Sequence, residues 1–338
     1  MASLPPLHVV RLLPHEHEFI PQQAVGLAPS PLGFRACYFS SEELAALAPG
    51  WIANQLAVAD EVLALAAGST WVGILGLRSK PWESEVFGRS MGEFSLFLTA
   101  DDSREFGLRT ALLTAGIARA QELGIEHLTC RLPTSCPRAI QTLETCGFRT
   151  VDTLLTLTRP TKPTVLTEPA RDFEVRFATA EDLPALASLA GTAFTVDRFH
   201  ADPFLDGARA DEAHREWVRN SVSGAAAEAV LVVARSTPAG RGEALGFLTL
   251  ARQTIGRLRL CVPGLGAIHQ EIRGRGWARR LAEHAVAWAH EHGCAVVEIN
   301  TQAANIASAR TYLGAGFKLL ATSQTLSGTF GKGGHEIG

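Results

Sequence analysis

The 338-residue sequence lacks several features that would place it in a familiar class of protein. No apolar run reaches the length of a transmembrane helix, and residues 1–13 lack the charged start and apolar core of a signal peptide. The formal net charge is only −3, which favours neither nucleic acid nor a membrane as a partner. The six cysteines form no Cys-x-x-Cys pair and suit a reducing compartment, so we expect a cytoplasmic protein.

Several chemical motifs are missing as well. His15 and His17, like His290 and His292, form His-x-His pairs without a third ligand or a cysteine, so no metal site is predicted. There is no Ser-His-Asp arrangement around a serine elbow. A Walker loop would need Gly-Lys-Ser/Thr, and a Rossmann fingerprint would need a third glycine; neither is present.

A glycine-containing turn stands out against these absences. An apolar run over residues 258–268 predicts a strand, and the apolar residues of 281–289 recur at helical spacing. Gly274 and Gly276 fall between the two, where the first N–H groups of a helix are exposed and attract an anion. Two arginines of the turn, Arg273 and Arg275, add positive charge. The turn therefore predicts a cradle for a pyrophosphate.

The turn also carries a recognisable pattern. Arg273, Gly276 and Ala278 spell Arg-x-x-Gly-x-Ala, which resembles the acyl-CoA loop of the GNAT N-acetyltransferases. Taken alone, the same residues fit an ordinary helix start after a glycine turn. The residues that follow favour the GNAT interpretation. A strand-like run over 295–299 precedes Asn305, Tyr312 and then Gly-Phe, in the order found in that family.

An internal repeat organises the whole chain. A shift of 169 residues aligns four pairs of anchors without a gap: Arg104 with Arg273, Gly107 with Gly276, Gly124 with Gly293, and Gly147-Phe148 with Gly316-Phe317. With the resemblance, the repeat predicts an α/β (α+β) protein of two tandem GNAT acyltransferase folds. Each is expected to be a mixed, mostly antiparallel sheet with helices on both faces. The expected domains are residues 1–160 and 173–338, joined by a proline-containing linker over 161–172.

The first copy lacks the residues that would do chemistry. Glu105 stands where a phosphate would lie, and Arg109 replaces the small residue of the turn. Cys136 and Leu143 stand where the second copy has its asparagine and tyrosine. We therefore interpret residues 1–160 as a degenerate GNAT-like domain, acting as a scaffold or as one wall of the acceptor pocket.

A narrower resemblance covers about residues 80–325. The stretch from Trp82 to Gly88 is similar to an element of dTDP-fucosamine (dTDP-4-amino-4,6-dideoxygalactose) acetyltransferases. Arg198-Phe199, Pro203, Trp217 and the segment 220–224 are similar to other elements of those enzymes. The resemblance implies an N-acetyltransferase (EC 2.3.1) that uses acetyl-CoA, with a nucleotide-linked 4-amino-deoxysugar as the acceptor. An amino acid, a peptide amine or an aminoglycoside-like product are alternative acceptors, and a non-catalytic acyl-CoA-binding protein is a further alternative.

The resemblance also implies roles for individual residues. Backbone groups of the strand before the turn would pair with pantetheine, and the N–H of Ile268 would polarise the thioester. Asn305 would bind the arm of acetyl-CoA. The full predicted cofactor set is Gly266, Ala267, Ile268, Arg273, Gly274, Arg275, Gly276, Trp277, Ala278, Arg279 and Asn305.

The predicted chemistry centres on Tyr312, one of only two tyrosines in the chain. A phenol with a pKa near 10 is a reasonable general acid for a thiolate with a pKa near 8.5. His269 is the best-placed general base, with His200, Glu298 or a chain of water molecules as alternatives. Arg198, His200 and Asp202 are expected to contact the acceptor. We expect a monomer or a homodimer.

Overall fold

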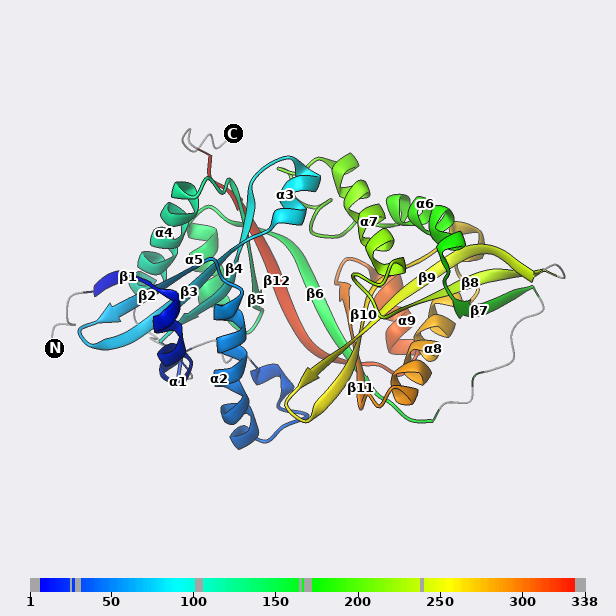
Figure 1. The fold of residues 1–338 in the computed structure, drawn as a ribbon, viewed down its shortest axis with the longest axis horizontal. Helices are drawn as coiled ribbons and strands as arrows, with labels where there is room; N and C mark the ends of the chain where they lie inside the picture. Colours follow the sequence, from blue (N-terminus) through cyan, green and yellow to red (C-terminus); the bar gives the residue numbers. More distant parts are fainter. Residues whose placement is uncertain are drawn as a thin grey trace. The chain divides into compact units, whose positions relative to one another are not determined.

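The computed structural model describes residues 7–24, 26–27, 32–100, 106–163, 166, 172–237 and 240–331. The chain divides into two compact units (Figure 1). The first unit contains the chain up to Val151 and again from Ser323, and the second contains Asp152–Thr322. Within the described ranges, no helix is both long enough and apolar enough to cross a membrane.

The first unit is built on one sheet with the strand order β1-β2-β3-β4-β5-β12. Its strands are β1 (Leu7–Leu12), β2 (Glu61–Ala67), β3 (Thr70–Ser79), β4 (Met91–Thr99), β5 (His127–Pro133) and the end of β12 (Lys318–Thr329). Its helices are α1 (Ile20–Ala24), α2 (Ser41–Ala57), α3 (Pro81–Phe87), α4 (Phe106–Glu122) and α5 (Pro137–Thr145), with short 3-10 turns η1 (Pro14–Phe19) and η2 (Gly33–Arg35). Neighbouring strands are antiparallel, except that β4 and β5 are parallel.

The second unit repeats this plan with the strand order β6-β11-β10-β9-β8-β7. Its strands are β6 (Arg149–Pro160), β7 (Phe173–Phe177), β8 (Ala229–Thr237), β9 (Gly240–Ile255), β10 (Leu258–Ile268) and β11 (Val296–Gln302). Its helices are α6 (Leu183–Ala193), α7 (Gly207–Val222), α8 (Trp277–Glu291) and α9 (Ile306–Gly314), with 3-10 turns η3 (Ala180–Asp182) and η4 (Gln270–Ile272). The single parallel pair in this sheet is β10 with β11.

The repeat seen in the sequence is reproduced in the secondary structure. Strand β11, helix α9 and strand β12 each begin and end 169 residues after β5, α5 and β6. The one parallel strand pair also falls at the same place in both halves. The two halves therefore have the same topology, each a mixed, mostly antiparallel sheet as predicted.

The last strand of each repeat belongs to the other unit. Residues 154–160 of β6 pair antiparallel with β11, and residues 323–329 of β12 pair antiparallel with β5. The units consequently differ from the predicted domains, because the chain passes into the second unit at residue 152 and returns to the first at residue 323. Most of the predicted linker, residues 164–165 and 167–171, lies outside the described residues.

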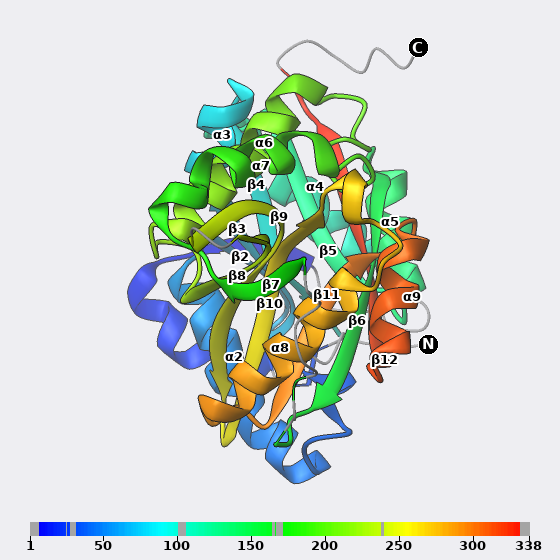
Figure 2. The ribbon, with the colours of Figure 1, turned by 90° about the vertical axis from the view of Figure 1, so that its right-hand side faces the viewer.

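Helices cover both faces of the second sheet (Figure 2). On β8, Leu231 and Val233 pack with helix α8, whereas Val230 and Val232 pack with helices α6 and α7. This alternation follows from the two-residue period of a strand, which sends successive side chains to opposite faces. Because β8 is apolar on both faces, it lies between two helical layers.

Candidate active site

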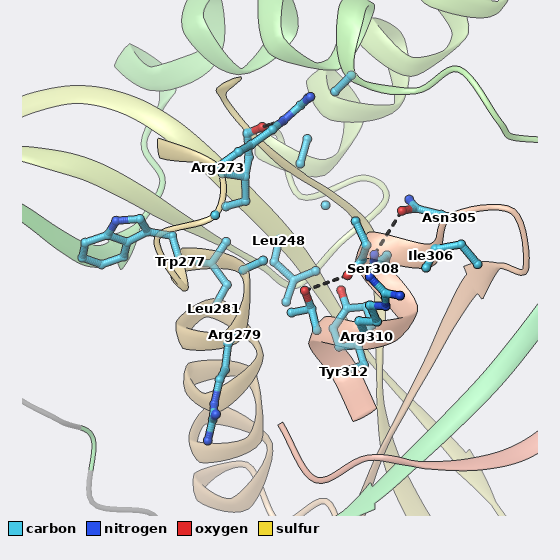
Figure 3. Close-up of a pocket in the computed structure, with 18 of the residues that line it drawn as sticks. Leu248, Arg273, Trp277, Arg279, Leu281, Asn305, Ile306, Ser308, Arg310 and Tyr312 are labelled. Atoms are coloured by element: carbon cyan, nitrogen blue, oxygen red, sulfur yellow. Dashed lines mark hydrogen bonds between the residues drawn. The ribbon is translucent and has the colours of Figure 1, made fainter. Parts of the chain in front are cut away.

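A cavity opens in the second unit where β10 and β11 separate. The two parallel strands pair over residues 260–261 and 296–297, close to their starts. Further along, the register of β10 against β9 shifts between Pro263 and Gly266, and the N–H of Leu265 donates to Thr249 Oγ1 at 2.8 Å. The strands therefore diverge toward their carboxyl ends. The cavity has a volume of about 880 Å³ (Figure 3).

Most of the predicted cofactor residues line this cavity. They come from the end of β10, the turn before α8, the start of α8, and α9. The set is Gly266, Ala267, Ile268, Arg273, Gly274, Gly276, Trp277, Ala278, Arg279 and Asn305, together with the predicted acid Tyr312. Five predicted residues are not among those that line it: Arg275, His269, Arg198, His200 and Asp202.

The turn before α8 has the geometry of an anion site. Gly274 and Gly276 have φ of 75° and 83°, in the left-handed region that residues with a side chain rarely adopt. A Cβ placed on either glycine would meet no atom within 4 Å, so both face open space. Gly276 is the N-cap of α8 and makes no side-chain cap bond. Gly276, Trp277 and Ala278 line the cavity, so the first turn of α8 borders the space in which an anion would lie.

The arginines of the turn differ in how they are held. Nε of Arg273 donates to the carbonyl oxygen of Ile268 at 2.9 Å, which fixes its guanidinium beside the end of β10. Nε of Arg279 donates to Glu283 one turn later at 2.9 Å. Arg275 is exposed. Arg273 and Arg279 line the cavity on the side of the turn, and Arg310 of α9 lines it as well.

Asn305 begins helix α9 at the opposite wall. Its Oδ1 accepts the N–H of Ser308 at 3.1 Å, as a helix N-cap does (Figure 3). This bond uses the oxygen of the carboxamide, and Asn305 is one of the residues that line the cavity. The amide nitrogen of Asn305, a donor of two hydrogen bonds, is thus the atom suited to a ligand.

Tyr312 lies two turns further along α9. Its ring packs edge-on against Phe317, with the ring centroids 5.6 Å apart. Its hydroxyl is hydrogen-bonded to the side chain of Ser308. Burial raises the pKa of Tyr312 well above its usual value of about 10, and the bond to Ser308 opposes that rise. The phenol is consequently protonated at neutral pH and can donate a hydrogen bond or a proton.

The predicted base lies beside the cavity. His269 follows the last residue of β10, and its backbone N–H donates to the carbonyl of Leu245 at 2.7 Å. Its Nδ1 accepts the N–H of Glu271 at 3.4 Å, capping the short turn η4. The ring of His269 therefore caps the turn η4, which leads into the glycine loop. This leaves Nε2 as the ring nitrogen that could take part in proton transfer.

The predicted acceptor residues lie in the segment between α6 and α7. The guanidinium of Arg198 lies over the ring of Phe199 at 4.1 Å. His200 is held at both ring nitrogens, Nδ1 2.6 Å from Asp197 Oδ2 and Nε2 3.2 Å from Asp211 Oδ1. Asp202 is buried, and its Oδ1 accepts the N–H of Phe204 at 3.0 Å. Both His200 and Asp202 therefore already have hydrogen-bond partners within the protein.

Several cavity residues were not predicted. The end of α6 and the residues after it contribute Phe194, Thr195 and Val196, and α9 contributes Ser308 and Arg310. Ser308 could have been found from helical spacing, since it stands three residues after Asn305 and four before Tyr312. The sequence carries no comparable signal for Phe194, because an apolar residue at a helix end is ordinary.

The first unit holds different residues at the matching positions. Cys136 is the N-cap of α5 without a side-chain cap bond, where the second unit has Asn305. Leu143, in place of Tyr312, is fully buried in the apolar core. Of the matching turn, Glu105 lies outside the described residues, and Arg109 is buried in α4.

Residues 194–317 match the Acetyltransferase (GNAT) family. The chain is 28% identical over 258 residues to the spore coat polysaccharide biosynthesis protein SpsD of Bacillus subtilis, which covers 75% of this chain and 83% of that protein. It is also 28% identical over 145 residues to a dTDP-fucosamine acetyltransferase of Escherichia coli, over 43% of this chain and 58% of that enzyme.

A solved structure extends the likeness to both halves. A tandem GNAT protein from the clavulanic acid biosynthesis pathway superposes with a TM-score of 0.60, over 97% of this chain and 100% of that one, at 15% identity. At this identity the likeness concerns the fold alone. It confirms the tandem fold that the 169-residue repeat predicted.

Proposed function

We propose that residues 194–317, which match the Acetyltransferase (GNAT) family, form a domain that moves an acetyl group from acetyl-CoA to a primary amine of a small molecule. The observation that carries the proposal is one cavity that joins an uncapped helix N-terminus at Gly276 with Asn305 and Tyr312. An anion site, an amide donor and a phenol are the groups that binding and protonating a CoA thiolate require.

The glycine turn fits the pyrophosphate of acetyl-CoA. The open space in front of Gly274 and Gly276 lets the phosphate oxygens approach the backbone N–H groups, and the macrodipole of α8 favours their charge. Arg273 and Arg279 contribute positive charge on either side of the turn. Arg275 does not line the cavity, and its role is limited to long-range attraction of the phosphates.

The end of β10 fits the pantetheine arm. Gly266, Ala267 and Ile268 pair on one side with β9, while their other edge faces the gap left by β11. An extended amide chain added at that edge would form the hydrogen bonds of a further strand. The N–H of Ile268 would polarise the thioester carbonyl, and the amide nitrogen of Asn305 would bind the arm from the opposite wall.

Transfer proceeds by direct attack. The acceptor nitrogen forms a bond to the carbonyl carbon, the carbon–sulfur bond breaks, and Tyr312 donates its proton to the leaving thiolate. The amine loses a proton either to Nε2 of His269 or to water. We favour water, since His269 does not line the cavity and its Nδ1 serves the turn η4.

For the acceptor, we propose a nucleotide-linked 4-amino-deoxysugar. Support comes from the dTDP-fucosamine acetyltransferase relative and from the segment between α6 and α7, which contributes Phe194, Thr195 and Val196 to the cavity. Arg198 of that segment is the candidate contact for a diphosphate. His200 and Asp202 act by holding the segment in shape through the bonds described above.

A thiol-release assay tests the proposal. The full chain is mixed with acetyl-CoA and a panel of amines that includes dTDP-4-amino-deoxysugars, amino acids and aminoglycosides. Release with the sugar nucleotides, lost in Tyr312→Phe, is the expected result. Release with other amines alone would retain the transfer and remove the sugar acceptor. No release with any amine, and no binding of acetyl-CoA by calorimetry, would refute the enzyme.

A further inference from the structure

Three side chains that the proposed reaction does not use form a cluster behind the wall of the cavity. Asp197 and His200 come from the segment after α6, and His214 comes from the middle of α7. Oδ2 of Asp197 is 2.6 Å from Nδ1 of His200 and 3.7 Å from Nε2 of His214. One potential ligand atom from each residue lies within 4.8 Å of the others, and among the described residues no other group meets this spacing.

The outer atom of each side chain is already held by a partner. Nδ1 of His214 is 2.8 Å from the carbonyl oxygen of Ala210, which makes it the N–H and leaves the lone pair on Nε2. Nε2 of His200 is 3.2 Å from Asp211, which leaves Nδ1 as its inward atom. Oδ1 of Asp197 accepts the N–H of Phe199 at 2.9 Å. All three inward atoms therefore face one point with their orientation fixed from outside.

This arrangement is the one that metal sites use. Ligating histidines donate their second N–H to a carboxylate or a backbone carbonyl, which sets the tautomer and the ring orientation. Ligand atoms about 2.1 Å from a tetrahedral ion are about 3.4 Å apart, and the distances of 2.6 and 3.7 Å lie on either side of that value. Asp197 and His214 are buried, so the site is shielded from bulk water.

We propose that Asp197, His200 and His214 bind a divalent transition-metal ion of the Zn²⁺ type. Two imidazoles and one carboxylate suit Zn²⁺ better than Mg²⁺ or Ca²⁺, which prefer oxygen ligands. Three protein ligands leave one coordination position for water or for a ligand.

The position of the site indicates a structural role for the ion. Phe194, which lines the cavity, stacks on His214 with the ring centroids 4.5 Å apart and the planes 9° apart. An ion at this place would tie the segment after α6 to helix α7, directly behind the acceptor side of the cavity. The site would therefore fix the cavity wall, whichever amine the domain acetylates.

Without an ion, the same geometry has a second explanation. A ring N–H of His200 could instead donate to Asp197, with His214 as a buried histidine that binds no ion. The two explanations differ in a measurable way, because only a metal site binds one equivalent of ion and releases protons as it does so.

The test uses the full chain with any affinity tag removed. The protein is stripped with EDTA, dialysed, and titrated with Zn²⁺ by calorimetry and with Co²⁺ by visible absorption. One equivalent of tight binding, with the absorption of tetrahedral Co²⁺, is expected for the wild type. Asp197→Asn and His214→Gln should lose it. Asp211→Ala removes only the outer partner of His200 and should weaken binding about 10- to 100-fold.

His292→Gln is the matched control. Like His214, His292 has Nδ1 near the carbonyl four residues earlier, at 2.7 Å from Trp288, and stacks on an aromatic ring, at 4.2 Å. His292 belongs to no group of potential ligands among the described residues, so His292→Gln should bind the ion as the wild type does. Circular dichroism checks that each variant is folded. A folded wild type that binds neither ion, or a folded Asp197→Asn that binds both as tightly as the wild type, would overturn the proposal.

Discussion

Ser308 hydrogen-bonds the hydroxyl of Tyr312 from one turn earlier on the same helix. The same Ser308 donates its backbone N–H to Asn305, the N-cap of α9. The first turn of α9 thus connects the proposed ligand-binding amide to the proposed acid. The hydroxyl of Tyr312 is held by its own helix, so its position does not depend on a distant loop.

The first prediction concerns the role of Tyr312. Tyr312→Phe removes the hydroxyl while keeping the ring against Phe317. Loss of a general acid lowers kcat by about 10²–10⁴-fold. The Kd of acetyl-CoA, measured by calorimetry, should change little, because the hydroxyl acts on the leaving thiolate. Tyr38→Phe, which removes the other tyrosine, should leave kcat unchanged. A Tyr312→Phe enzyme with wild-type kcat would contradict the assignment.

The second prediction concerns the pKa of Tyr312. Burial disfavours the phenolate and raises the pKa, so the phenol ionises above the usual value of about 10, and the protonated, active form persists to more alkaline pH. In a Tyr38→Phe background, absorbance of tyrosinate reports Tyr312 alone. Ser308→Ala removes a bond that lowers the pKa and should shift the titration further upward. Ionisation at or below the usual value, in a protein still folded by circular dichroism, would refute this.

The third prediction separates two roles of Asn305. Asn305→Asp keeps an oxygen that accepts the N–H of Ser308, so the cap and the free energy of unfolding should be preserved. It removes the amide donor and adds a negative charge, and the Kd of acetyl-CoA should rise tenfold or more, about 1.4 kcal/mol. Asn305→Ala loses the cap as well and should lower the free energy of unfolding by about 1 kcal/mol. Wild-type affinity in Asn305→Asp would exclude the amide as a ligand.

The fourth prediction concerns the glycine turn. Gly276→Ala forces a φ of 83° on a residue with a side chain, which costs about 1–2 kcal/mol of stability. Its methyl group would also occupy the open space proposed for the pyrophosphate, so binding of acetyl-CoA should weaken beyond detection in calorimetry. Gly207→Ala is the matched control, since it also adds a methyl in open space but at a helical position in α7. Equal affinity in both variants would argue against the cradle.

Much of the fold and of the cavity was predictable, because both depend on local patterns. The 169-residue repeat fixed the topology, and the order of glycine turn, Asn305 and Tyr312 placed most of the cavity wall. These residues lie near one another in the sequence, in the glycine turn or on helix α9. Their spacing along a helix or strand translates directly into position.

The acceptor side could not be predicted in the same way. His200 is engaged by Asp197, its neighbour in the chain, but also by Asp211 on α7, and that partnership exists only once α7 is packed. The exchange of β6 and β12 is invisible for a different reason. Each of the two strands ends its own repeat, and both have the same pairing pattern, so the sequence does not distinguish which unit receives which strand.

The last prediction tests that exchange. Because residues 323–329 pair with β5, deleting the chain from Ser323 removes an edge of the first unit, although it shortens the second repeat. Hydrogen–deuterium exchange of β5, residues 127–133, should accelerate strongly, because its backbone loses hydrogen-bond partners on one side. Exchange in β11, which pairs with β6, should change much less.

Leu326→Ala is a milder form of the same test, because Leu326 is fully buried in the core of the first unit. This substitution should lower the free energy of unfolding by about 2–5 kcal/mol and again accelerate exchange in β5. Faster exchange confined to β11 in both variants would mean that each repeat keeps its own last strand.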